Sequence, residues 1–151
     1  MQTRRETLKK SALVAGLLAS TGLFPQYAFA YDKAAFEAKS LADVLKALGA
    51  GAPVESKDVL IGGPDIAENG AVVPLTASTT LSGVKQILIL VEKNPAALVA
   101  QFNVTDSVEA SFATRSKMGQ SSDVYAVAVM ADGKAFFAKK EVKVTLGGCG
   151  G

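Results

Sequence analysis

The stretch Val84-Lys85-Gln86-Ile87-Leu88-Ile89-Leu90-Val91 has apolar side chains on both sides of an extended chain. Successive side chains of a β-strand point to opposite faces, so Ile87, Ile89 and Val91 share one face while Leu88 and Leu90 share the other. The run is too short for a typical buried helix and rich in β-branched residues. We therefore predict a central strand over 84–91 that is covered on both faces.

Further short apolar runs flank this strand on both sides, and turn residues separate them. Asn69-Gly70 predicts a turn between paired strands at 66–67 and 71–73, and Asp132-Gly133 predicts the turn of a second hairpin. Pro74 predicts an edge strand or a bulge, because proline cannot donate to a ladder. Phe112 is expected to point inward.

Other strands are expected at 59–61, 98–104, 111–117, 124–130 and 135–146. About seven short strands without helices between them predict a mainly β fold, an antiparallel β-sandwich of immunoglobulin type.

One helix is predicted before the strands, over residues 33–48, with Asp32 as its N-cap. Its apolar face is formed at spacings of four and three by Ala34, Ala38, Leu41, Leu45 and Leu48, and Val44 and Ala35 widen it. Such a helix can cover one side of the domain or dock on a partner subunit, and the first interpretation is favoured.

The first 30 residues have the pattern of an export signal: basic residues, an apolar run over 12–24 and the small-x-small ending Ala28-Phe29-Ala30. The paired Arg4-Arg5 match the twin-arginine signal. The apolar run is shorter than the roughly 20 residues of a membrane span, so we expect no stable membrane anchor. The expected organisation is a signal peptide over 1–30, cleaved after Ala30, a β-sandwich domain with its N-terminal helix over 31–146 and a segment over 147–151. We expect a periplasmic protein exported in folded form.

Composition excludes several classes of function. The chain has a net charge of +2, of which Arg4, Arg5, Lys9, Lys10 and Glu6 contribute +3, which leaves about −1 for the rest. Nothing in this charge favours nucleic acid or an anionic membrane as a partner. The chain has no histidine and one cysteine, which excludes a Ser-His-Asp triad and an ordinary zinc, haem or iron–sulfur site. We expect neither an enzyme nor a metal site.

The cysteine lies in Gly147-Gly148-Cys149-Gly150-Gly151, which we call the cysteine arm. Glycine has no side chain to pack and loses much entropy when ordered, so we expect a mobile arm that presents its thiol to other proteins. Only a few per cent of an ordinary cysteine is thiolate at neutral pH, so activation is expected to come from a partner's active site. The simplest alternative is an inert tail.

The chain resembles the SoxY family, the sulfur-carrier subunits of the periplasmic thiosulfate-oxidising Sox system. The residues that carry the resemblance are the cysteine arm, Arg4-Arg5, Glu68-Asn69-Gly70-Ala71-Val72-Val73-Pro74-Leu75 and Val127-Ala128-Val129-Met130. The terminal Gly-Gly-Cys-Gly-Gly sequence on an exported domain is the most specific of these features.

The resemblance implies that Cys149 holds pathway intermediates covalently and that no other cofactor is needed. It implies a heterodimer with a SoxZ-like subunit, which travels with the carrier. The haem enzyme SoxXA would join thiosulfate to the cysteine as an S-thiosulfonate, and the hydrolase SoxB would release sulfate. SoxCD, where present, would oxidise the remaining sulfur as a transient partner.

A second hypothesis stays open beside the carrier. The chain could be an exported sandwich with a binding or structural role, whose Cys149 only forms an intermolecular disulfide. A conjugated Gly-Gly tail like that of ubiquitin-type carriers fits less well, because the cysteine lies between two glycine pairs and the domain is expected to be exported already folded.

Overall fold

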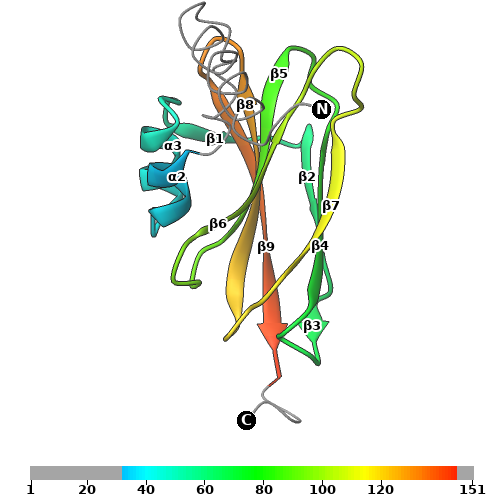
Figure 1. Ribbon diagram of the computed structural model, residues 1–151. Helices are drawn as coiled ribbons and strands as arrows, with labels where there is room; N and C mark the ends of the chain where they lie inside the picture. Colours follow the sequence, from blue (N-terminus) through cyan, green and yellow to red (C-terminus); the bar gives the residue numbers. More distant parts are fainter. Residues whose placement is uncertain (1–31, 146–151) are drawn as a thin grey trace, which may run out of the picture. The chain divides into compact units, whose positions relative to one another are not determined.

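The computed structural model describes residues 32–145. Its strand β5 (Val84–Val91) has the same bounds as the strand predicted from the sequence. It is an interior strand of the larger sheet, antiparallel to β8 (Ser122–Met130) on one side and to β6 (Leu98–Asn103) on the other (Figure 1). Both faces of β5 are buried, as predicted. Ile87, Ile89 and Val91 lie in one hydrophobic core, and Leu88 and Leu90 lie in another.

The larger sheet continues on the far side of β8. Strand β9 (Ala135–Val144) is antiparallel to β8, and the short β1 (Pro53–Glu55) runs parallel to β9 at the edge. The resulting order is β1-β9-β8-β5-β6, and β3 (Ile66–Ala67) also pairs with β9, in parallel. Two parallel pairs therefore join a sandwich that the sequence predicts to be wholly antiparallel.

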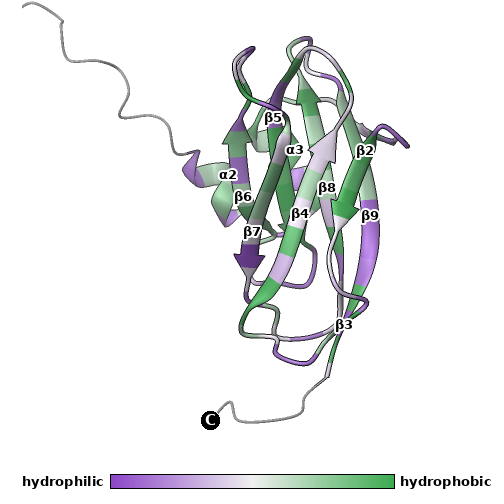
Figure 2. Ribbon diagram, turned by 90° about the vertical axis from the view of Figure 1, so that its right-hand side faces the viewer, coloured by the Kyte–Doolittle hydropathy of each residue, from purple (hydrophilic) through white to green (hydrophobic). Residues whose placement is uncertain are grey.

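A smaller sheet packs against the larger one and contains β2 (Val59–Gly62), β4 (Val73–Thr79) and β7 (Ser111–Ser116), all antiparallel, with β4 in the middle (Figure 2). The core between the sheets includes the aromatic stack of Phe102 on β6 and Phe112 on β7, with ring centres 4.4 Å apart. Phe112 thus points inward, and the immunoglobulin-type sandwich is confirmed.

The second core lies on the outer face of the larger sheet, where two helices cover it. The single helix expected over 33–48 is instead α2 (Lys33–Glu37) and α3 (Leu41–Ala47). Ala38 between them has an extended backbone, and the Ser40 side chain accepts from Asp43 N as the N-cap of α3. A residue that caps a helix has a non-helical backbone, so the cap at Ser40 interrupts the predicted helix.

The predicted apolar face packs against the sheet except at its first residue. Ala34 is exposed, while Ala35, Val44 and Leu45 are buried in the core with Leu88 and Leu90. The helices therefore cover one side of the domain, as the favoured interpretation stated.

Of the two predicted hairpins, the Asp132-Gly133 hairpin between β8 and β9 is confirmed, with Gly133 at φ +86°. The other was wrong. Asn69 does form a turn, because its Oδ1 accepts from Ala71 N at 2.9 Å, but β3 pairs with β9 rather than with β4.

The expectation for Pro74 is also only partly right. Strand β4 is central in its sheet, yet its pairing with β2 ends at Thr76, so β4 has one neighbour at Pro74, namely β7.

Candidate functional site

The predicted site residues lie outside the residues that the structure describes. This holds for Cys149 and the glycines Gly147, Gly148, Gly150 and Gly151, and also for Arg4, Arg5, Ala28 and Ala30 in the predicted signal. What the structure describes is the end of β9 that leads to the arm. Val144 ends the strand and Thr145 follows, four residues before Cys149. We call Val144 and Thr145 the root of the cysteine arm.

Strand β3 holds one side of the root. Ile66 pairs with Lys143 and Ala67 pairs with Val144 in the parallel ladder. Thr145 continues this contact, since its backbone N donates to Ala67 O at 3.1 Å and its hydroxyl donates to the same oxygen at 3.4 Å. The chain is therefore hydrogen-bonded up to the last residue that the structure describes.

Ser121 and Gly70 make the other contacts at the root. Val144 N donates to Ser121 Oγ at 2.9 Å, just beyond the first β8–β9 pair. Met118 N donates to Gly70 O at 2.7 Å, and a Cβ at position 70 would overlap Met118 O and crowd Val144 Cγ1. Position 70 therefore needs glycine because of this close approach, while its turn is also supported by Asn69.

A lysine fixes the segment that leads into β3. Lys140 Nζ donates to Gly63 O at 2.6 Å and forms an ion pair with Asp65 Oδ1 at 2.8 Å. The hydrogen bond from Lys140, and then its charge, hold the pKa of Asp65 below its usual 3.8. Lys143 N also donates to Asp65 O at 3.0 Å, so residues 63–67 are tied across β9 at three successive points.

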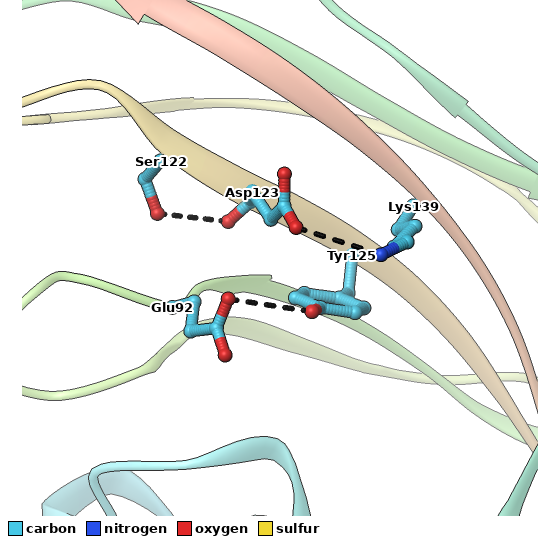
Figure 3. Close-up of polar contacts among 5 residues, drawn as sticks. All are labelled: Glu92, Ser122, Asp123, Tyr125 and Lys139. Atoms are coloured by element: carbon cyan, nitrogen blue, oxygen red, sulfur yellow. Dashed lines mark hydrogen bonds and ion pairs between the residues drawn. The ribbon is translucent and has the colours of Figure 1, made fainter.

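A second polar cluster lies on the outer face of the larger sheet and was not predicted (Figure 3). Tyr125 points toward Glu92, to which its hydroxyl donates at 3.4 Å, and Lys139 forms an ion pair with Asp123 at 3.7 Å. Burial raises the pKa of Tyr125, as do the charges of Glu92 and Asp123. A tyrosine with a raised pKa stays protonated at neutral pH and is a poor base or nucleophile. This cluster therefore links the turn after β5 to β8 and β9 and offers no obvious chemistry.

Other candidate sites are few in the described part of the chain. Residues 32–145 contain no group of three or more His, Cys, Asp or Glu side chains that could hold a metal ion. No helix within the same range is long and apolar enough to cross a membrane. Hollows of about 490 and 240 Å³ open beside Gly133 and beside Gly83, near the β8–β9 turn and the start of β5. Both hollows lie at the end of the sandwich opposite to the root.

The sequence missed the contacts of the root. The sequence places residues 66–67 in a hairpin with 71–73, and no pattern in it marks Ser121 as a contact of the end of β9. The Lys140–Gly63 hydrogen bond joins residues 77 positions apart, and no short-range pattern predicts such a pair. Gly70 gave a usable signal as a turn residue, although its close packing did not show in the sequence.

Comparison with known proteins connects this site to a family. A family model described as "Sulfur oxidation protein SoxY" matches residues 44–149, a span that includes the root and extends to Cys149. Among solved structures, the sulfur carrier protein SoxY from Chlorobium limicola f thiosulfatophilum is 34% identical over 71% of this chain and 97% of its own, with a TM-score of 0.63.

A more distant likeness concerns the fold alone. Superoxide reductase (neelaredoxin) from Ignicoccus hospitalis is 16% identical over 58% of this chain and 80% of its own, with a TM-score of 0.52. Among curated proteins, none matches this chain.

Proposed function

Since this chain belongs to the SoxY family of sulfur oxidation proteins, we propose that Cys149 holds thiosulfate-derived intermediates covalently and presents them to the enzymes of the pathway. The observation that carries this proposal is the extent of the family match, which ends on the only cysteine of the chain. The family makes the chain a carrier in sulfur oxidation, and the cysteine is the residue whose chemistry suits covalent attachment.

The proposed loading step is an oxidative coupling. Cys149 loses its thiol proton, a bond forms between its sulfur and the outer sulfur of thiosulfate, and an electron pair leaves to the haem enzyme. The product is a cysteine S-thiosulfonate. Water then attacks the sulfonate group, sulfate leaves, and one additional sulfur remains on Cys149. Further oxidation and a second hydrolysis restore the thiol.

The described structure supports different roles for the folded domain, which we call the body, and for the cysteine arm. The root is held by β3 and Ser121, and Cys149 follows Thr145 by four residues. Four residues span at most about 14 Å, enough to pass through the wall of a deep active site. The body therefore fixes where the arm starts, and the arm sets how far the thiol reaches.

The proposal extends to partners and location. The chain pairs with a SoxZ-like subunit, meets SoxXA, SoxB and, where present, SoxCD as transient partners, and itself performs no catalysis. The Arg4-Arg5 signal supports export in folded form to the periplasm. Replacing Arg4 and Arg5 with lysine is expected to leave the protein in the cytoplasm, which cell fractionation measures.

The first test is the intact mass of the protein purified from cells growing on thiosulfate, before and after a reductant. We expect a reducible addition of sulfur or thiosulfonate on the peptide that contains Cys149. Unmodified thiol together with a disulfide-linked dimer would instead favour the structural module.

The matching variant is Cys149→Ser. Its hydroxyl cannot form the sulfur–sulfur bond, so thiosulfate-dependent turnover is expected to fall to background. Its melting temperature and its binding to the partner subunit should equal those of the parent. Turnover at the parental rate would refute the carrier proposal.

A further inference from the structure

The cysteine arm has almost no side-chain surface with which to bind a partner. Four of its five residues are glycine, and the fifth is the cysteine that reacts. Affinity in protein interfaces comes mainly from a few buried apolar or aromatic side chains. If the arm delivers sulfur to several enzymes, as proposed above, the side chains that hold each enzyme must come from the body of the carrier.

The length of the arm limits where those side chains can lie. Cys149 is at most about 14 Å from Thr145 along an extended chain. An active site that encloses Cys149 must therefore have its opening within that distance of the root. The surface beside the root is covered by the partner in every productive encounter.

Two large apolar side chains beside the root are exposed. Ile66 is 56% exposed and Val72 is 51% exposed. Ile66 is the first residue of β3, which lies beside the end of β9 (Figure 1). Val72 comes two residues after Gly70, whose close approach to Val144 is described above.

Both side chains are tied to the root through the backbone. Ile66 is paired with Lys143, and its neighbour Asp65 is held by Lys140 at 2.8 Å. Val72 N donates to Asn69 O at 3.4 Å, next to the Gly70–Met118 hydrogen bond. A protein that binds Ile66 and Val72 therefore also fixes the position from which the arm extends, which favours correct placement of the thiol.

We propose that Ile66 and Val72 form a docking patch for the apolar rim of the active-site opening in the enzymes that react with Cys149. This proposal rests on the carrier function proposed above. A stable heterodimer buries about 1,200–2,000 Å² in total, far more than two side chains supply. The patch suits a weak, repeated encounter rather than the permanent subunit.

The test compares two double variants of the full chain in complex with its partner subunit. Ile66→Thr with Val72→Thr removes the apolar surface while keeping β-branched residues on the strand and turn. The control is Val54→Thr with Leu60→Thr, whose parent residues are exposed to 58% and 57% but belong to β1 and β2. The assay is the enzymatic coupling of thiosulfate to the carrier, with the carrier as the varied substrate.

For the patch variant we expect a rise in KM of about tenfold and a kcat within twofold of the parent, because docking is lost while the arm is intact. The control variant should have a KM within twofold of the parent. Reaction of Cys149 with a small alkylating reagent should proceed at the parental rate in both. A single Val72→Thr variant repeats the test if the double variant unfolds, with a smaller rise in KM expected.

The outcomes separate this inference from the carrier proposal. An unchanged KM in a folded patch variant, or an equal rise in the control, overturns the docking patch alone. Loss of the partner subunit from the patch variant assigns Ile66 and Val72 to the permanent interface and also overturns it. Parental turnover by Cys149→Ser overturns the carrier proposal itself.

Discussion

The two ends of strand β9 are held in different ways. At the start, Ala135 follows a turn in which Met130 N donates to Lys134 O at 2.8 Å, so the partners are four residues apart. At the far end, Val144 and Thr145 contact Ser121 and Ala67, which are 23 and 78 residues away. The turn at the hairpin end is closed by local contacts, to which Gly51 and β1 add long-range contacts with Gly133 and Ala135. The contacts described for the root are all long-range, so they exist only when the whole domain has folded.

This difference matters for a carrier. The root sets the starting point of the arm, and its long-range contacts tie that point to β3 and to the connection between β7 and β8. Each hydrogen bond at the root contributes only about 1 kcal/mol to stability. The root is therefore fixed by several modest contacts together, and changes at individual residues should separate it from the hairpin end.

The largest expected effect is that of Gly70→Ala. The new Cβ would overlap Met118 O, a backbone atom that cannot move aside cheaply, and would crowd Val144 Cγ1. Overpacking of this kind costs about 2–3 kcal/mol. We expect a lower free energy of unfolding in urea and faster hydrogen exchange at Val144 and Thr145.

Gly119→Ala is the matched control for this variant. It follows Met118, the residue that Gly70 approaches, in the connection between β7 and β8, and a Cβ there meets nothing within 4 Å. Its free energy of unfolding should stay within about 0.5 kcal/mol of the parent. If both variants lost the same free energy of unfolding, the close packing at Gly70 would not be what holds the root.

A smaller effect is expected from Gly133→Ala at the hairpin end. Gly133 has φ +86°, a left-handed conformation that costs a residue with a Cβ about 1–2 kcal/mol. Urea unfolding should show this loss. Exchange at Val144 and Thr145 should rise only as far as global unfolding does, and a selective rise there would contradict the independence of the two ends.

The same contrast explains how far the sequence predicted the fold. The alternation in 84–91 and the Asp132-Gly133 turn depend on neighbouring residues, and both were correct. The break between α2 and α3 was also local, since Ser40 and Asp43 form its cap, but the apolar spacing of Leu41 and Leu45 outweighed that signal.

The root could not be predicted in the same way. Strand β3 has two residues, and its parallel partner comes about 77 positions later, so neither its period nor its turn identifies the pairing. Cys149 was evident in the sequence because it is the only cysteine and lies between two pairs of glycines. The sequence thus indicated which residue to propose as the reactive one, while the three-dimensional contacts show what holds the root.

The smallest expected effect compares exposed aspartates at the two ends. Hydrogen bonding to Lys140 lowers the pKa of Asp65 at the root, and hydrogen bonding to Lys134 lowers that of Asp132 at the hairpin. A carboxyl whose pKa is lowered in the folded state stabilises that state above its unfolded pKa, and this contribution fades as the pH falls through the folded value. Asp65→Asn and Asp132→Asn should therefore each lower the urea midpoint slightly at pH 7 and leave it unchanged near pH 2, where the parent carboxyls are also neutral. Salt should shrink both differences, because the carboxyls are exposed and screening weakens such pairs.

Only Asp65→Asn should also raise hydrogen exchange at Lys143, whose amide donates to Asp65 O. A loss that persists at pH 2 would show that the asparagine side chain itself disturbs the turn, and the ion pair would then not be what fixes residues 63–67 across β9.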